Sequence, residues 1–150
     1  MSKGTLKSGL IELVAIVAAL VGLVMYVITS TTGYLAGRAV DPLPIVLTVI
    51  AIGALGAGLV LRDRMTPVVR DVLLLVSVAA LAASLAIYLL ARVPLAGDVY
   101  FIPVNYPEAE ATTLHISFVG LALYLVAVIA TIVEAFRPRR SATTLQVAVV

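Results

Sequence analysis

Four segments without a charged side chain constrain the fold of this chain more than any other feature. They cover residues 13–37, 42–61, 72–91 and 111–133. Each is long enough for a helix of about 20 apolar residues, which is what crossing the hydrocarbon of a bilayer requires. Only 12% of the residues are charged, which is about half the share found in soluble domains. The sequence therefore predicts a single-domain, all-α membrane protein, with four transmembrane helices over about residues 10–30, 43–61, 70–91 and 112–136.

The basic residues are distributed unevenly over the connections between these helices. Eight of the ten Lys and Arg residues precede the first helix, join the second to the third, or follow the fourth. The other two connections contain only Arg38 and Arg92. By the positive-inside rule, connections rich in Lys and Arg stay in the cytoplasm. The sequence therefore predicts a four-helix bundle with both termini inside. A composition rich in Ala, Val, Leu and Gly, with more Arg than Lys, favours a bacterial plasma membrane, and a net charge of +2 gives no reason to expect nucleic-acid binding.

Local signals predict where the helices begin and end. Gly33 can end the first helix in the left-handed conformation. Asp41 and Thr66 each precede a proline and are expected to cap the second and third helices. The longest outer connection is expected after the third helix, with residues 97–111 as an outer loop. Residues 141–150 have no helical period and are predicted to form a flexible tail.

The outer loop has the most unusual composition of the chain, because rings, prolines, an amide and acids follow one another closely. Its backbone over residues 100–107 is expected to be extended, since Pro103 interrupts any strand. The residues expected to contact a partner are Asp98, Tyr100, Phe101, Asn105, Tyr106, Glu108 and Glu110. Membrane anchoring by the tyrosines is the first interpretation, a protein interface the second and a sugar site the third. A calcium ion on the loop oxygens is disfavoured, and His115 is expected to form an interfacial hydrogen bond.

Small and polar side chains recur at helical spacing within the predicted spans. In lipid, such residues let helices approach closely and form hydrogen bonds, because the hydrophobic effect does not drive helices together there. The residues expected to pack helix against helix are Gly53, Ala57, Ser77, Ser84, Ser117, Gly120, Tyr124 and Thr131. Packing within one four-helix bundle is the favoured interpretation, and contact with a second membrane subunit is the alternative.

Two acidic residues lie near the cytoplasmic ends of the predicted helices. Glu134 has Arg137 one turn away, and Glu12 can reach water or Lys7, so interfacial ion pairs are expected for both. The alternative makes Glu12 an ion or proton site, since ionisable groups in membranes are usually functional. An acidic residue in the first of four helices resembles the small multidrug-resistance exporters. This chain differs from them because Glu12 lies near the interface, tryptophan is absent and the last outer connection is longer.

The features that enzymes and pumps require are missing from the sequence. There is no cysteine, nucleophile motif, phosphate-binding glycine loop or dedicated metal-ligand spacing, so no enzyme activity, cofactor or metal is expected. No charged residue or proline lies near the middle of a predicted span, which argues against a self-sufficient pump.

Three functions are compatible with these features. The most economical is a non-catalytic membrane subunit that packs against a larger membrane protein and presents the outer loop for contact. One alternative is a small oligomeric transporter that uses Glu12 and the polar packing residues, and another is an outer-face binding module for a sugar or envelope polymer. The expected partners are therefore the lipid bilayer and either another membrane protein or a second copy of the chain, with an extracytoplasmic glycan as the remaining alternative.

Overall fold

The computed structural model describes residues 3–102 and 108–138, and within these residues the regular secondary structure is entirely helical. The elements are α1 (Lys3–Thr31), the short 3-10 helix η1 (Gly33–Leu35), α2 (Leu43–Val60), α3 (Pro67–Phe101) and α4 (Glu108–Ala135). All four α-helices are long and apolar enough to cross a membrane, which confirms the four spans predicted from the uncharged segments.

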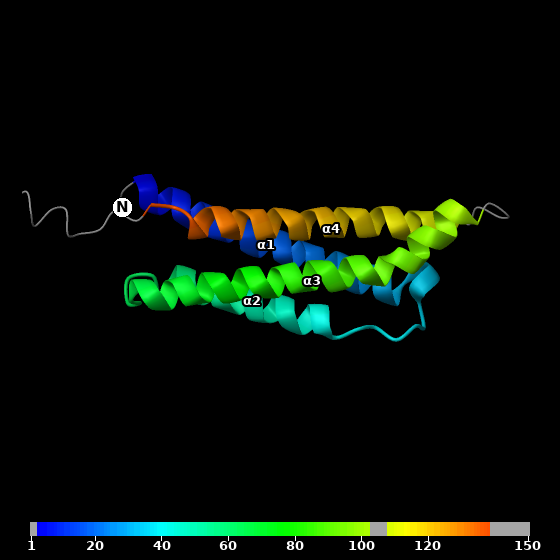
Figure 1. Cartoon of the computed structure of the whole chain (residues 1–150), viewed down its shortest axis with the longest axis horizontal. Coiled ribbons are helices and arrows are strands. Elements are labelled where there is room, and N and C mark those ends of the chain that lie inside the picture. The colour runs from blue at the N-terminus through cyan, green and yellow to red at the C-terminus, as the bar shows by residue number, and fades with distance from the viewer. Residues whose placement is uncertain (1–2, 103–107, 139–150) are drawn as a thin grey trace, which may run out of the picture.

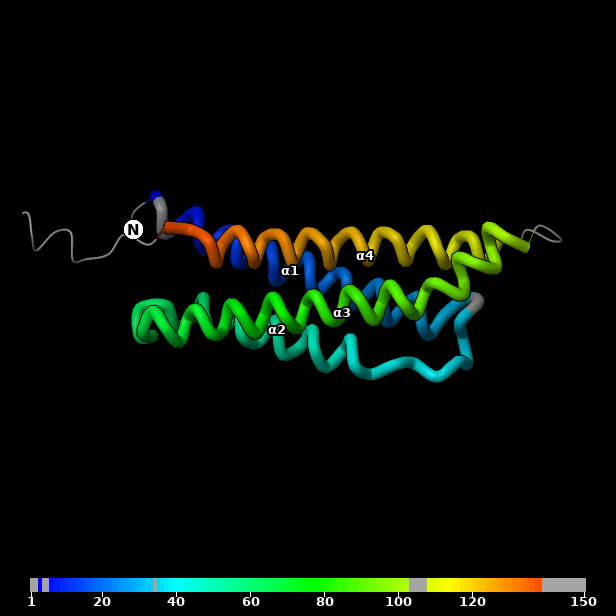
Figure 2. Tube along the Cα trace, in the orientation of Figure 1, coloured from blue at the N-terminus to red at the C-terminus, as the bar shows by residue number. Residues whose placement is uncertain are grey.

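The α-helices lie side by side along the long axis of the molecule as an antiparallel bundle (Figure 1). The start of α1, the turn between α2 and α3, and the end of α4 lie together at one end. The connection between α1 and α2, with η1, lies at the other end together with the last turns of α3, and the chain trace is followed most easily in Figure 2.

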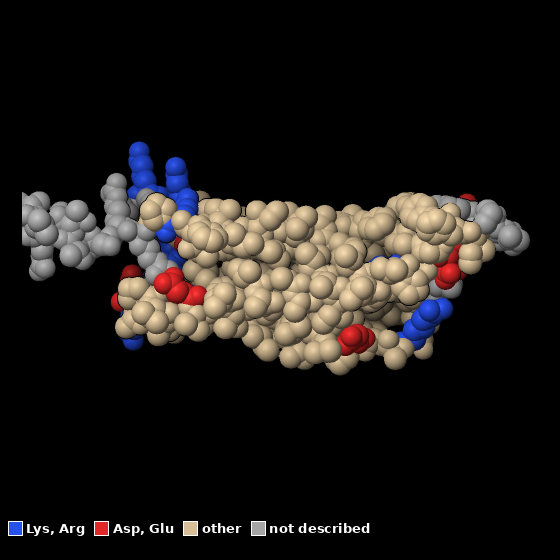
Figure 3. Space-filling view, in the orientation of Figure 1, with Lys and Arg blue, Asp and Glu red and all other residues tan. Residues whose placement is uncertain are grey.

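Charged side chains gather at the two ends of the bundle and leave the middle uncharged (Figure 3). We call the end where α1 begins and α4 ends the basic end, because most of the described Lys and Arg residues are there. We call the other end the acidic end, because two basic residues there face four acidic ones. These six residues are Arg38, Arg92, Asp41, Asp98, Glu108 and Glu110.

Close approach between α1 and α4 depends on glycine. α1 packs mainly against α4, while α2 packs mainly against α3. A Cβ atom at Gly22 would lie 3.3 Å from the carbonyl oxygen of Gly120, and one at Gly120 would lie 3.0 Å from the Met25 Cβ. Side chains of normal size would therefore force the two helices apart, as expected where packing between membrane helices relies on small residues.

α3 does not end near residue 91 as the sequence predicted, but continues to Phe101 with Pro94 inside it. Pro94 has no N–H to donate to the carbonyl one turn earlier, and the helix bends toward α4 in its last part (Figure 1). Beyond the bend, Leu95 and Val99 pack with Leu114 of α4 in a second apolar cluster. This packing stabilises a helix that the proline alone would have ended. The prediction of a non-helical connection from residue 92, extended from Tyr100, is wrong for the residues through Phe101.

The predicted boundaries elsewhere follow from caps that the structure contains. The hydroxyl of Thr66 accepts a hydrogen bond from the Val69 N–H at 3.4 Å, with Pro67 as the first residue of α3. Asp41 Oδ1 accepts from the Leu43 N–H at 2.9 Å, where α2 begins. Gly33 has φ +67°, the left-handed conformation expected after α1. The predicted tail, residues 141–150, lies outside the described residues.

Candidate functional sites at the two ends of the bundle

An ion-pair cluster joins three helices at the basic end. One guanidinium nitrogen of Arg70, Nη2, lies 2.6 Å from Glu12 Oε1 of α1 and 2.7 Å from Glu134 Oε1 of α4. Glu12 is 1% exposed and Glu134 is 5% exposed. An arginine of α3 whose side chain is 15% exposed thus binds two buried carboxylates that come from different helices.

Two further groups complete the ion-pair cluster, which we define as Ser8, Glu12, Arg62, Arg70 and Glu134. Arg62 Nη2 lies 3.5 Å from Glu134 Oε1, and the Ser8 hydroxyl bridges these two side chains by accepting from Arg62 and donating to Glu134. Two arginines therefore face two carboxylates, so the formal charges balance. One oxygen each of Glu12 and Glu134, both called Oε2, is buried and accepts no hydrogen bond from the described residues.

Of the ion pairs expected from the sequence, the one between Glu134 and Arg137 forms, but Glu12 has a different partner. Arg137 lies 3.9 Å from Glu134, as the one-turn spacing suggested, but Arg70 is much closer to that carboxylate. Glu12 does not rely on water or Lys7, because its partner is Arg70 and its side chain is buried. Sequence reasoning missed Arg70 because it is 58 residues from Glu12, and only the folded bundle brings the two together.

A guanidinium cluster lies toward the acidic end, and we define it as Arg92 with Tyr26, Thr29, Ser30, Tyr88 and Ser117. Arg92 Nε donates to the Ser117 hydroxyl at 3.0 Å. Its Nη2 donates to the hydroxyls of Thr29 at 2.9 Å and Ser30 at 2.8 Å. Arg92 itself is 5% exposed, so its charge is enclosed by α1, α3 and α4.

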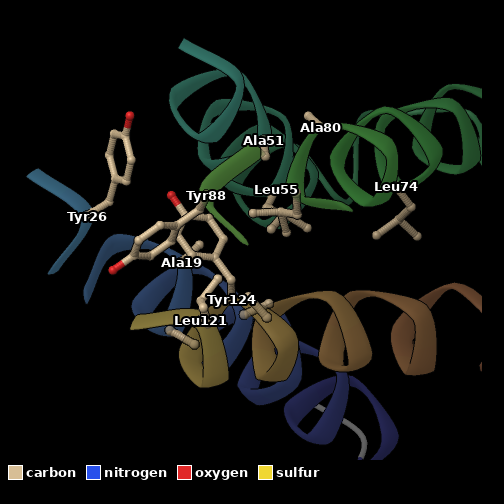
Figure 4. Packing of buried hydrophobic residues seen from close by; sticks show 13 residues of the cluster. Ala19, Tyr26, Ala51, Leu55, Leu74, Ala80, Tyr88, Leu121 and Tyr124 are labelled. Carbon is tan, nitrogen blue, oxygen red and sulfur yellow. The ribbon is translucent and has the colours of Figure 1, made fainter. Parts of the chain in front are cut away.

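Two tyrosine rings cover the guanidinium. The Arg92 Cζ lies 5.7 Å from the centre of the Tyr26 ring and 5.1 Å from that of Tyr88, which is the range of cation–π contacts. The two rings meet edge to face with centres 4.9 Å apart, and the hydroxyl of Tyr26 donates to the Asp41 carbonyl oxygen at 2.9 Å. Figure 4 shows the rings of Tyr88 and Tyr124 among the side chains of the core, with Tyr26 to one side of them.

No Asp or Glu among the described residues lies within 4.0 Å of the Arg92 side chain. The acceptors of its hydrogen bonds are neutral hydroxyls, which orient their dipoles toward the charge without cancelling it. α3 contains both Arg92 and Pro94, which the sequence had placed in the connection after residue 91, and neither lies near the middle of the helix. Arg92 and Pro94 lie close together just after the predicted end of the third span, so the sequence did not identify them as part of that helix.

The residues predicted for partner contact are split over two helices. Asp98, Tyr100 and Phe101 lie in the last turns of α3, and Glu108 and Glu110 form the first turn of α4. Tyr100 is 60% exposed and Phe101 is 83% exposed. Asn105 and Tyr106 lie outside the described residues. His115 is exposed on α4, and the described residues contain no cluster of three metal-ligating side chains.

The residues predicted for helix packing fall into two groups. Those of α3 and α4 are buried, namely Ser77, Ser84, Ser117, Gly120, Tyr124 and Thr131. Tyr124 and Ser84 meet at Thr48 of α2, whose hydroxyl lies 2.6 Å from that of Tyr124 and 3.1 Å from that of Ser84.

On α2 the predicted packing pair lies away from the main contact face. Gly53 is exposed, with no heavy atom within 4 Å of a Cβ built there, and Ala57 is only half-buried. The face that packs in the bundle instead contains Ala51, Leu55 and Gly58. The spacing of small residues was equally good on both faces, so only the position of α3 decides between them.

Comparison of the chain with protein-family models, with curated proteins and with solved structures found no match. The arguments about function therefore depend on the geometry of these two clusters and of the exposed ends.

Proposed function

We propose that this protein is a multi-pass subunit of a bacterial plasma membrane, without catalytic activity, that binds a larger membrane protein. In this proposal the basic end is cytoplasmic, because Lys and Arg are retained on that side during insertion. Both termini are then inside, and the acidic end faces outward. The contact surface is the outer tip, which we define as Asp98, Tyr100, Phe101, Ile102 and Glu108.

The length of α3 is the observation that carries this proposal. Its 35 residues correspond to about 52 Å of helix, which exceeds even the roughly 40–45 Å of a bilayer with its headgroups. Arg70, in the ion-pair cluster, lies near the start of α3, and Phe101 lies about 46 Å farther along the helix. The last turns of α3 are therefore expected to project from the hydrocarbon into the outer headgroups and water.

Apolar side chains on this projection are left exposed by the described residues. Phe101 is 83% exposed, Tyr100 60% and Ile102 56%. At lipid depth such exposure would be ordinary, but beyond it a contiguous apolar surface is typical of a protein contact. Asp98 lies in the same last turns of α3 and Glu108 begins α4, so the partner should present basic or hydrogen-bond-donating groups around an apolar centre.

Photo-crosslinking at one of two matched phenylalanines tests the proposal. Phe101 at the tip and Phe136 at the basic end are both aromatic and are 83% and 85% exposed. A benzophenone amino acid at position 101, in the full chain in its native membrane, should form one dominant crosslink to a larger membrane protein. That protein should also co-purify stoichiometrically in mild detergent and be lost when Phe101→Ala and Tyr100→Ala are combined.

The control at position 136 should not give the same product. Crosslinks only to lipid at position 101, or the same products from both positions, would contradict the proposal. A dominant crosslink to a second copy of this chain would also contradict it, because a homo-oligomer would then occupy the tip.

The transporter alternative receives less support from the surroundings of Glu12. A proton- or cation-binding glutamate should have a free carboxylate facing a path, whereas Glu12 is 2.6 Å from Arg70 and buried. Glu12→Gln in reconstituted vesicles tests this directly, since the subunit proposal predicts no change in any proton-coupled flux.

A further inference from the structure

We propose that Arg92 is the centre of a binding site for an oxyanion of the phosphate type at the outer surface of the membrane. The ligand would be either the phosphate of a lipid headgroup or a free phosphate ion. This site is separate from the contact surface at the outer tip, and it does not depend on a protein partner.

The charge of Arg92 needs compensation. A guanidinium that is 5% exposed has lost most of its contact with solvent, which is costly for an ion unless an opposite charge compensates it. The ion-pair cluster supplies that compensation to Arg70 with Glu12 and Glu134. The guanidinium cluster supplies Arg92 only with hydroxyls and rings among the described residues. A negative charge from outside the chain would complete it.

The depth of Arg92 in the membrane also suits a phosphate. On α1, Glu12 and Thr29 are 17 residues apart, and on α4, Ser117 and Glu134 are also 17 residues apart. Along a helix, this separation is about 26 Å. The hydrocarbon of a bilayer is about 30 Å thick, so the two clusters lie near its opposite boundaries. With the ion-pair cluster at the inner boundary, Arg92 lies close to the level of the outer phosphate groups.

The guanidinium of Arg92 is also a suitable donor for a phosphate. A guanidinium is planar and can donate hydrogen bonds to phosphate oxygens from more than one nitrogen. Ser30 and Thr29 accept from Nη2 and Ser117 accepts from Nε, so the plane is fixed before a ligand arrives and Nη1 is the nitrogen left to donate to it. The space-filling view shows basic atoms partly covered by uncharged ones between α3 and α4 in this half of the bundle (Figure 3).

The acidic residues of this end do not take the place of the ligand. Asp41 caps α2 through its Oδ1, which accepts from Leu43 N–H at 2.9 Å, and Tyr26 contacts its backbone carbonyl. Asp98 is six residues beyond Arg92, which is about 9 Å along α3. Both carboxylates lie outside ion-pair distance of Arg92.

Tyrosine fluorescence gives a local readout, because the chain contains six tyrosines and no tryptophan. Tyr26 and Tyr88 contact the guanidinium, so an anion that binds there should change their emission. The full chain is delipidated in a maltoside detergent, which contains no phosphate. One arm adds inorganic phosphate, with sodium chloride at equal ionic strength as the reference. The other arm uses nanodiscs of phosphatidylglycerol, with nanodiscs of a galactolipid that lacks phosphate as the reference.

The wild type should show a saturable change in tyrosine emission and a higher midpoint of thermal unfolding in at least one arm. A response to inorganic phosphate identifies a free oxyanion as sufficient, and a response to phosphatidylglycerol alone identifies the lipid headgroup; either supports the proposal. Arg92→Gln should lower the affinity at least about tenfold, because it removes charge-assisted hydrogen bonds. Arg38→Gln changes the other basic residue of this end and should bind like the wild type.

Arg92→Lys protects the test against misfolding of the glutamine variant. Lysine keeps the charge but loses the planar fork, so the affinity should again fall at least about tenfold. Asp41→Asn should leave binding as strong as in the wild type, since this carboxylate is not the counter-charge. The proposal is overturned if the wild type responds in neither arm, or if Arg92→Lys or Arg92→Gln binds the probe as tightly as the wild type.

Discussion

The bundle holds a largely enclosed arginine near each end, and the two are held in different ways. Arg70 lies between two carboxylates, whereas Arg92 lies among three hydroxyls and two tyrosine rings. Arg92 is 5% exposed and the Arg70 side chain is 15% exposed, so both have lost most of their contact with water. The difference lies in whether the protein itself supplies the opposite charge.

This difference predicts that substitutions in the two clusters lower the free energy of unfolding by different amounts. Removing one partner of a buried ion pair leaves the other charge uncompensated, which costs far more than the pair contributes. Removing a buried charge without a carboxylate partner leaves no such charge behind. We therefore expect the ion-pair cluster to act mainly as a structural link and the guanidinium cluster to tolerate substitution.

Arg70→Gln should have the largest effect on stability. It leaves the carboxylates of Glu12 and Glu134 buried with less compensation, and the free energy of unfolding should fall by about 3–5 kcal/mol. Reversible unfolding in mixed micelles measures this value. Arg64→Gln is the matched control, because Arg64 is an exposed arginine of the preceding turn and should change stability by less than about 0.5 kcal/mol. A loss below 1 kcal/mol for Arg70→Gln would show that the pairing has little energetic weight.

A double-mutant cycle should detect direct coupling within the ion-pair cluster. Glu12→Gln alone should lower the free energy of unfolding by about 1.5–3 kcal/mol. In combination with Arg70→Gln, the total loss should be smaller than the sum of the two single losses by about 1–3 kcal/mol. Glu12→Gln combined with Arg92→Gln should be additive within about 0.5 kcal/mol, because the two clusters share no contact. Equal coupling in both cycles would contradict the separation of the clusters.

Gly120→Ala should disturb the guanidinium cluster through packing rather than charge. Its new Cβ would lie 2.7 Å from the Tyr88 hydroxyl and 3.0 Å from the Met25 Cβ, so α1 and Tyr88 would have to move. Overpacking of this kind costs about 1–3 kcal/mol. Gly53→Ala, where a Cβ meets nothing within 4 Å, should instead stabilise α2 by up to about 1 kcal/mol. Thermal unfolding of the two variants distinguishes them, and destabilisation by Gly53→Ala would point to a contact outside this chain.

Local sequence signals predicted much of the fold and little of the sites. The uncharged runs predicted the four long apolar helices, since length and hydropathy alone decide what can cross a bilayer. Thr66 with Pro67 predicted the start of α3, since a cap acts within one turn. The end of α3 was not predictable in this way, because the packing of Leu95 and Val99 on α4 outweighs the effect of Pro94.

Both charged clusters depend on residues that are far apart in the chain. Glu134 and Arg137 were found as a pair because they are one turn apart, but Arg70 is 64 residues from Glu134. Arg92 was assigned to a loop, where an arginine needs no explanation. Its burial follows only once α3 is known to continue past it and α1 and α4 are known to enclose it.

Arg92→Gln should have the smallest effect of the buried substitutions. It removes three hydrogen bonds and two ring contacts, but it also removes a charge with little compensation. The hydroxyls of Thr29 and Ser117 retain acceptors, since each also donates to a backbone carbonyl one turn earlier at 2.8 Å. We expect a loss of about 1 kcal/mol, which follows from the modest net worth of a hydrogen bond.

The most direct test compares Arg92→Gln and Arg70→Gln in the same phosphate-free detergent, by the free energy of reversible unfolding. We expect Arg70→Gln to lower the free energy of unfolding by at least about 2 kcal/mol more than Arg92→Gln, because only the former leaves buried carboxylates without their main partner. An equal cost, or a greater one for Arg92→Gln, would contradict the claim that the chain compensates one largely enclosed arginine and leaves the other for a ligand.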